Sequence, residues 1–287
     1  MKINDLKTRQ SVKRFSIDRI GVGAGKLDDY VATEEPLEIR LAYTSPTDGE
    51  RVEQSISITM RTPGNDRELA IGFLFSEGIV TRKRDVFSVA PCGPPSPNGL
   101  INVVRVELSD DVDVDLNRLE RHFYTSSSCG VCGKSSLEAV AVQGHYDLHD
   151  LDLTINAQQL GHIPGALAKK QAVFKQTGGL HACGLFDASG NVIEIREDVG
   201  RHNAFDKLVG QALQADEIPL DQYGVIVSGR ASFELMQKAM MAGLPLLAAV
   251  GAPSSLAIEL AEEFGMTLVG FLKENKLNIY TRADRIK

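Results

Sequence analysis

Apolar and polar side chains alternate in the first third of the chain, over residues 37–42 and again over residues 55–60. A period of two is typical of strands that bury one face. A third apolar run, residues 101–108, follows a stretch rich in proline and glycine. Together these patterns predict a smaller, strand-rich α+β domain over residues 27–124.

The sequence also carries start and stop signals for helices. Asn65 is followed three residues later by Glu68, the spacing of a capping box, and Gly78 supplies a stop. Farther along, Pro164 suits the first position of a helix and Gly178 suits its end. We therefore expect a short helix in the first domain and a longer one early in the second.

The second half of the chain alternates between apolar runs and segments of helical period. The runs at residues 225–227, 244–250 and 266–271 have the length of buried strands. Apolar residues from Phe205 onward recur at the i, i+3, i+4, i+7 spacing of an amphipathic helix. Strands separated by single helices imply parallel crossovers, so we predict a layered α/β domain over residues 135–287.

Composition excludes several classes of protein. The chain has 287 residues, 43% of them hydrophobic, and a formal net charge of −7, which argues against general nucleic-acid binding. No apolar run reaches the about 18 residues of a membrane span, and the N-terminus lacks the apolar core of an export signal. With only four cysteines, we expect a cytoplasmic protein without membrane attachment.

The beginning of the chain is locally basic. Its cations outnumber its carboxylates, and we expect residues 1–26 to form a solvated, partly disordered arm. A docking arm for an acidic partner is an alternative that nothing else in the sequence supports. The charged residues are Lys2, Lys7, Arg9, Lys13, Arg14, Arg19 and Lys26, against Asp5 and Asp18.

Three apolar runs of the α/β domain end in segments suited to an anionic ligand. Parallel sheets bind ligands beyond the carboxyl ends of their strands, and these runs lead into residues 228–230, 251–255 and 271–276. Glycines allow close backbone approach, helix N-termini supply N–H groups, and Arg230 and Lys273 supply positive charge. Ordinary connections explain each segment alone, but three that converge favour a ligand site.

His181 and His202, each two residues after a glycine at an expected element boundary, are stronger functional candidates than histidines on an apolar face. Asn203 is a plausible N-cap for the helix that follows it. The chain contains neither a G-x-G-x-x-G nor a G-x-x-x-x-G-K-[ST] motif, so the sequence supports neither a Rossmann dinucleotide site nor a P-loop.

Cys129 and Cys132 form a C-x-x-C pair in a Ser/Gly-rich segment, residues 125–134, that suits a mobile loop. Structural zinc is the commonest role of such a pair, although zinc needs four ligands. A redox pair and a persulfide carrier are also open, and the motif alone ranks neither above zinc. Lys134 and a nearby helix N-terminus would favour a thiolate at either cysteine. The other candidate zinc ligands are Cys92, Cys183, His181 and His202.

Five motifs follow one another along most of the chain. They are residues 128–133, 177–181, 198–204 and 228–230, and the tail from Phe271 to Thr281. Each is weak alone, but their order is specific, and together they resemble the FdhD family of formate dehydrogenase accessory sulfurtransferases. Cys183 is a departure, since a small residue such as alanine is expected there.

The resemblance implies a sulfur carrier. Such a protein takes persulfide sulfur from a cysteine desulfurase and passes it to the bis-molybdopterin guanine dinucleotide form of the molybdenum cofactor, before insertion into formate dehydrogenase. It further implies a homodimer, no permanent metal, and a C-terminal domain with a cytidine-deaminase-like fold that lacks deaminase chemistry.

The resemblance also implies roles for particular residues. Cys129 corresponds to the nucleophile that carries the persulfide, and Cys132 to a neighbour that accepts the sulfur or resolves the persulfide as a disulfide. The implied cofactor-binding residues are Phe271, Leu272, Lys273, Glu274, Asn275 and Lys276, with Arg201, His202 and Arg230 as further candidates.

Two alternatives compete with the sulfur carrier. The first is a zinc-stabilised module that binds the cofactor as a chaperone without transferring sulfur. The second is an active nucleoside deaminase, which the absence of an H-x-E motif disfavours.

Overall fold

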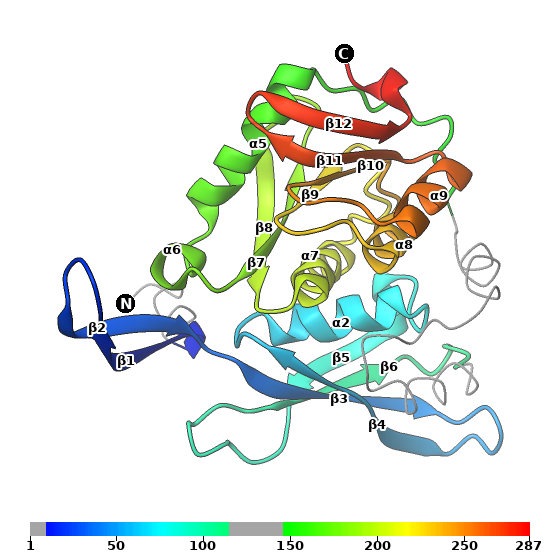
Figure 1. The fold of residues 1–287 in the computed structure, drawn as a ribbon. Helices are drawn as coiled ribbons and strands as arrows, with labels where there is room; N and C mark the ends of the chain where they lie inside the picture. The colour runs from blue at the N-terminus through cyan, green and yellow to red at the C-terminus, as the bar shows by residue number, and fades with distance from the viewer. Residues whose placement is uncertain (1–9, 115–145) are drawn as a thin grey trace.

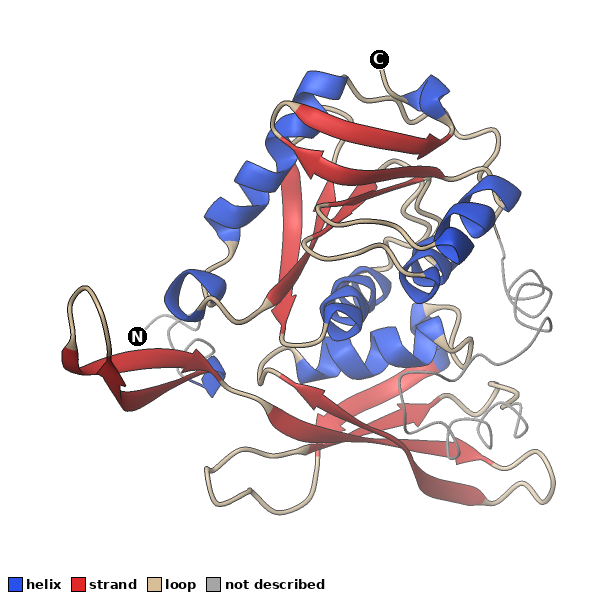
Figure 2. Ribbon diagram, in the orientation of Figure 1, coloured by secondary structure: helices blue, strands red, loops and turns tan. Residues whose placement is uncertain are grey.

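The computed structural model describes residues 10–114 and 146–287 of the chain. Within these ranges, a small hairpin and a four-stranded sheet belong to the N-terminal part, and a six-stranded sheet belongs to the C-terminal part. Figure 1 shows helices α2 and α7 between the two larger sheets, and Figure 2 shows the same layers by element type.

The N-terminal part consists of the hairpin β1–β2 and a sheet of order β4-β3-β6-β5. Helix α2 (Asp66–Ser76) covers the inner face of the sheet, where its Leu69 and Leu74 share an apolar cluster with Ile39. A short 3-10 helix, Lys83–Asp85, precedes β5. The strands are β1 (Val12–Arg19), β2 (Gly25–Ala32), β3 (Glu35–Thr44), β4 (Arg51–Arg61), β5 (Val86–Pro91) and β6 (Val103–Leu108).

The C-terminal part is a sheet of order β12-β11-β10-β9-β7-β8, in which β9, β10 and β11 run parallel. Its strands are β7 (His181–Phe186), β8 (Val192–Asp198), β9 (Gly224–Val227), β10 (Leu246–Ala249), β11 (Thr267–Lys273) and β12 (Lys276–Thr281). Its helices are α5 (Ala157–Lys170), α6 (Phe174–Thr177), α7 (Arg201–Ala215), α8 (Phe233–Met241), α9 (Ser255–Glu263) and the 3-10 helix Ala283–Arg285.

Helices cover both faces of this sheet, as expected for a layered α/β arrangement. On one face, Leu160 and Ile163 of α5 belong to the same apolar cluster as Phe186. On the other face, α7, α8 and α9 bury their apolar sides in a separate, larger cluster that includes Phe205. This cluster continues into the N-terminal part, so the two larger sheets share one core.

The mixed α/β class predicted from the sequence is confirmed. The apolar runs expected to be parallel strands are β9, β10 and β11. The period-two segments of the first domain lie in β3 and β4, and Gly78 ends the turn after α2 with a φ of 69°. Among the described residues, no helix is long and apolar enough to cross a membrane.

Residues 12–26 differ from the expected disordered arm, because they form most of the β1–β2 hairpin. Ile17 lies opposite Leu27 in this hairpin. Gly21 and Gly23, in the connection between the strands, have φ values of 98° and 74°, which glycine adopts without steric cost and which allow the chain to reverse. The expected boundary after residue 26 therefore falls inside the hairpin.

Two local predictions in the second domain are wrong. Helix α5 begins before Pro164, because the side chain of Asn156 accepts a hydrogen bond from the Gln158 backbone (2.8 Å) and caps the helix there. Pro164 is an interior residue of α5. Residues 271–276, expected to be a loop after the third apolar run, are the end of β11, a tight turn and the start of β12, which pairs antiparallel with β11.

Two glycines let helices α2 and α7 cross at backbone contact. A Cβ atom on Gly72 would lie 1.8 Å from the carbonyl oxygen of Asp206, and one on Gly210 would lie 1.9 Å from that of Glu68. No side chain fits at either position while the helices stay at this distance. The crossing brings the helix of the N-terminal sheet against the C-terminal part (Figure 1).

We predict that Gly72→Ala lowers the free energy of unfolding by about 2–3 kcal/mol, because the added methyl group forces two helix backbones apart. Gly165→Ala is the matched control. Gly165 lies in α5, and a Cβ there would meet no atom within 4 Å. Alanine at Gly165 should stabilise the protein by up to about 1 kcal/mol. Urea unfolding followed by circular dichroism measures both changes, and an unchanged midpoint for Gly72→Ala would contradict the proposed close crossing.

Candidate functional site

A buried ion pair lies where the two parts of the protein meet. The ammonium group of Lys207 on α7 is 2.6 Å from Oδ2 of Asp198, the last residue of β8, and the two side chains are 2% and 0% exposed. Lys207 Nζ also donates to the carbonyl oxygens of Thr62 (2.9 Å) and Glu197 (3.4 Å). A buried ion pair is tolerated only when hydrogen bonds satisfy its remaining donors and acceptors, and these contacts do so.

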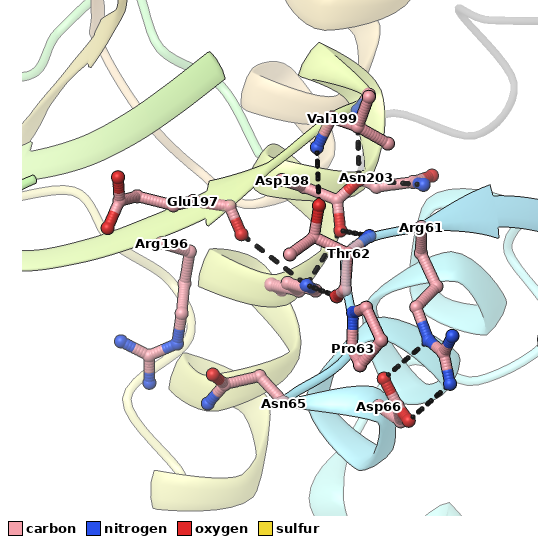
Figure 3. A network of polar contacts seen from close by, with 12 residues as sticks. Arg61, Thr62, Pro63, Asn65, Asp66, Arg196, Glu197, Asp198, Val199 and Asn203 are labelled. Atoms are coloured by element: carbon pink, nitrogen blue, oxygen red, sulfur yellow. Dashed lines mark hydrogen bonds and ion pairs between the residues drawn. The ribbon is translucent and has the colours of Figure 1, made fainter. Parts of the chain in front are cut away.

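Two backbone donors and one side-chain donor, from both parts of the chain, complete the hydrogen bonds of Asp198. Its Oδ2 accepts from Thr62 N (3.1 Å), and its Oδ1 accepts from Gly200 N (2.8 Å) and Asn203 Nδ2 (3.2 Å). Thr62 Oγ1 in turn accepts from Val199 N (3.3 Å). Figure 3 shows how these bonds join the end of β4 to the turn that leads into α7.

A second buried cation, Arg61, fixes the neighbouring strand end. Its Nε and Nη2 donate to the two carboxylate oxygens of Asp66, each at 3.0 Å. Nη2 also donates to Asn102 Oδ1 (3.0 Å), and Nη1 to the Glu35 carbonyl (3.4 Å). Because Arg61 directly precedes Thr62, these bonds hold Thr62 where it contacts the Lys207–Asp198 pair.

Asn203 belongs to this structural network. Its Nδ2 donates to the Met60 carbonyl (2.8 Å), and its Oδ1 accepts from Thr59 Oγ1 (3.2 Å). The prediction that Asn203 caps the helix is wrong, because α7 begins at Arg201 with Gly200 at the cap position. A Cβ on Gly200 would lie only 3.1 Å from Asn203 Nδ2, so glycine permits this close contact.

The first turn of α7 brings Arg201 and His202 to the carboxyl end of the sheet. The side chain of Arg201 lies beside Gly229, and its Nε is buried without a hydrogen-bond partner among the described residues. His202 Nε2 is 2.8 Å from Glu234 Oε2 and 3.4 Å from Ser232 Oγ. A buried donor without a partner costs about 1–3 kcal/mol. A ligand that supplies an acceptor at this position would remove that cost and so gain binding free energy.

The connections that follow β9 and β10 lie beside the last part of β11 at this edge. Gly251 N donates to the Gly229 carbonyl (2.9 Å), and Phe271 N donates to the Gly251 carbonyl (3.0 Å). A Cβ on Gly251 would lie 2.9 Å from the same Gly229 oxygen, so glycine is needed for the two connections to touch. The three segments that we expected to converge are therefore adjacent in the structure.

The predicted cofactor-binding residues fall into two groups. Arg201, His202, Arg230 and Phe271 belong to the carboxyl edge of the sheet, where Phe271 is 41% exposed and has a φ of 52°. Leu272 is fully buried in the apolar cluster beneath α5, so only its backbone is available to a ligand. The hairpin turn packs on α5, where a Cβ on Gly161 would lie 2.4 Å from the Glu274 carbonyl. The exposed residues of this hairpin tip are Lys273, Glu274, Asn275 and Lys276.

His181, at the start of β7, faces the same edge. Its Nδ1 is 3.5 Å from Ser228 Oγ, and its ring lies against Gly229. Burial lowers the pKa of His181, the positive charges of Arg201 and His202 lower it further, and Asp198 opposes them. The site therefore favours a neutral imidazole at His181 beside its cations.

Sequence reasoning missed three polar residues of this region: Ser232, Glu234 and Lys207. Ser232 and Glu234 begin α8, where serine and glutamate are ordinary residues of a helix start, so their positions carry no functional signal. Lys207 lies among the apolar residues of α7. A lysine on the apolar face of a helix is the sequence feature that could have indicated a buried ion pair.

The predicted catalytic cysteines, Cys129 and Cys132, lie outside the described residues. Cys183 is fully buried, and burial raises its pKa well above the usual value, with a further contribution from Asp206. Cys183 is therefore an unreactive thiol. Within the described part of the chain, no three His, Cys, Asp or Glu side chains are grouped to hold a metal.

The geometry at the sheet edge suits an anion. Helix α7 is 15 residues long, and within the described ranges neither its N-terminus nor that of α8, whose N-cap is Ser232, has a side-chain cap bond. Free N–H groups and the positive end of a helix favour phosphate, and Arg201 Nε adds an unpaired donor. The described structure thus defines a mixed α/β protein with a phosphate-suited sheet edge.

Residues 32–287 match the sequence profile of the FdhD/NarQ family, and the chain belongs to this family. It is 48% identical over 278 residues to the sulfur carrier protein FdhD of Streptomyces coelicolor, covering 96% of this chain and 95% of the relative. It is 50% identical to the protein of that name from Mycolicibacterium paratuberculosis, over 89% of this chain and 91% of the relative. The resemblance found from the motifs is confirmed.

More distant comparisons agree with this assignment. The sulfur carrier protein FdhD of Saccharolobus solfataricus is 42% identical over 96% of this chain and 98% of its own length. A crystal structure of a protein from Desulfotalea psychrophila, provisionally described as a formate dehydrogenase accessory protein, shares the fold. Its TM-score is 0.72 at 24% sequence identity, over 96% of this chain and 100% of that chain.

The lowered pKa of His181 predicts a pH dependence of stability. The folded state binds fewer protons at this residue than the unfolded state, so the free energy of unfolding falls as the pH drops below about 6.5, the usual histidine value. His181→Gln removes this contribution and should lose less stability than the wild type between about pH 7.5 and about pH 5.5. Urea unfolding at both pH values measures the difference.

His162→Gln is the matched control, because the side chain of His162 is 58% exposed and its ion pair with the exposed Glu274, at 3.8 Å, contributes little to stability. It should keep the pH dependence of the wild type. An identical loss of stability in His181→Gln and wild type would contradict a neutral His181.

Proposed function

We propose that the chain is a cytoplasmic sulfur carrier for the maturation of formate dehydrogenase. The observation that carries this proposal is its similarity to proteins named sulfur carrier protein FdhD, at 42% to 50% identity over at least 91% of each relative. The C-x-x-C pair of Cys129 and Cys132 supplies the thiols that such a role requires.

Cys129 is the nucleophile in the proposed mechanism. Its thiolate attacks the terminal sulfur of a persulfide on a cysteine desulfurase, and the S–S bond of that persulfide breaks. The electron pair of the broken bond stays on the desulfurase cysteine, which leaves as a thiolate, while Cys129 becomes a persulfide. Cys132 is the neighbour that accepts the sulfur or resolves the persulfide as a disulfide.

The proposed acceptor is the bis-molybdopterin guanine dinucleotide form of the molybdenum cofactor, which is a substrate here. Its phosphates are the groups that Arg201, His202 and Arg230 would contact. The Nε of Arg201 has no hydrogen-bond partner among the described residues, and a phosphate oxygen would supply the acceptor that it needs. When the persulfide delivers its terminal sulfur, the acceptor provides the electron pair of the new bond and Cys129 returns to a thiolate. Phe271 and the hairpin that ends at Lys276 contribute the remaining surface for this substrate.

Three further parts of the proposal rest on the family resemblance. The α/β domain is related to the cytidine-deaminase-like fold, two copies of the chain form a homodimer, and no metal is resident. Formate dehydrogenase receives the sulfurated cofactor from this protein.

We predict that Cys129→Ala abolishes sulfur loading. The wild type, after incubation with a cysteine desulfurase and cysteine, should gain the mass of one sulfur atom on the peptide that contains Cys129, and the gain should disappear with dithiothreitol. Intact-protein and peptide mass spectrometry measure this gain. Cys183→Ala is the matched control and should load normally, because Cys183 is buried.

Two outcomes would contradict the sulfur carrier. One is loading of Cys129→Ala to the wild-type extent. The other is one tightly bound zinc per chain that is lost when either Cys129 or Cys132 is replaced, which would favour the zinc-stabilised chaperone instead.

A further inference from the structure

One carboxylate lies among the cations of the proposed phosphate edge. Glu234, in the first turn of α8, reaches across to α7, where its Oε2 is 2.8 Å from His202 Nε2. Its pKa is lowered by the hydrogen bond from His202 and by the positive charges of His202, Arg201 and Lys238. Glu234 is therefore an ionised carboxylate where a ligand phosphate would be expected.

The surrounding charges make Glu234 the local counter-anion. Lys238, on the next turn of α8, is held by Asp206 at 2.7 Å and is already neutralised. The Nε of Arg201 has no hydrogen-bond partner among the described residues. On β7, His181 faces Arg201 and His202, and its lowered pKa places no further positive charge at the edge. Glu234 thus contacts His202 and offsets the positive charge of Arg201.

The anion and the cations differ in how firmly the protein holds them. The side chain of Glu234 is 41% exposed and extends from a helix end, so it can turn into water. The Arg201 side chain has its Nε buried beside Gly229. His202 is attached to the helix start that Asp198 fixes through Gly200 N. An incoming anion can therefore displace the carboxylate without moving the arginine.

We propose that Glu234 is an internal competitor for phosphate: its carboxylate binds His202 and offsets the positive charge of Arg201 in the free protein, and a ligand phosphate displaces it on binding. This inference rests on the proposed function, because it concerns the same edge. A diphosphate ligand, with more than one negative charge, competes with a single carboxylate more effectively than a monoanion does. The exchange also favours release, which a carrier needs in order to pass on its cargo.

Binding of guanosine diphosphate to the full-length protein tests this inference. Isothermal titration calorimetry at low salt should show that Glu234→Gln binds about tenfold more tightly than the wild type, because the neutral amide no longer competes. The affinity of the variant should also fall more steeply with salt, because no carboxylate at position 234 then offsets the positive charge of Arg201. Arg201→Gln should lose binding.

Glu263→Gln is the matched control. It makes the same change in net charge at an exposed position on α9 and should bind as the wild type does. Unchanged or weaker binding by Glu234→Gln would overturn the inference.

The same titrations separate this inference from the proposed function. Binding that Arg201→Gln abolishes and Glu234→Gln leaves unchanged overturns the competitor role alone. Absence of binding in both the wild type and Glu234→Gln overturns the phosphate edge, and the competitor role with it. Sulfur loading on Cys129 is measured independently and tests the carrier role in either case.

Discussion

The arrangement of this protein depends on the buried ion pair of Lys207 and Asp198. Removal of two charges from water costs several kcal/mol per ion, and the pair is stable only because other groups complete its hydrogen bonds. Thr62 supplies two of them, its N–H to Asp198 and its carbonyl to Lys207. The N-terminal sheet therefore provides part of the shell around a charge pair on β8 and α7. The contact of α2 with α7 at Gly72 and Gly210 is the packing that accompanies this bond network.

The same pair determines the geometry of the proposed phosphate edge. Asp198 accepts a hydrogen bond from Gly200 N, and this bond fixes the residue at which α7 begins. Arg201 and His202 are the next two residues, so their side chains leave the backbone at a point that the buried carboxylate sets. A change in the N-terminal sheet can therefore alter the proposed ligand edge through this turn. The stability of the fold and the position of the proposed ligand-binding residues therefore depend on the same hydrogen bonds.

Local patterns predicted the elements well where each pattern has one physical explanation. Apolar runs such as residues 225–227, bounded by turn residues, became parallel strands, and their connections converged because parallel strands share one carboxyl edge. The buried role of Lys207 could not be predicted, because its partners lie far away in the sequence and lysine is ordinarily exposed. The contact of Glu234 with His202 depends on how α8 lies beside α7, which no local pattern encodes.

The helix predicted to begin at Pro164 begins earlier in the chain, because Asn156 caps α5 before the proline is reached. The roles of Cys129 and Cys132 rest on their motif and on the relatives, since both lie outside the described residues.

A double-mutant cycle on the buried pair tests the central claim most directly. The free energy of unfolding in urea is measured for the wild type, Lys207→Met, Asp198→Asn and the double variant. We predict that each single substitution costs about 3–5 kcal/mol, because it leaves the opposite charge buried and unpaired, and that the double variant costs clearly less than the sum. Additive losses, or losses below about 1 kcal/mol in both single variants, would contradict a structure built on this interaction.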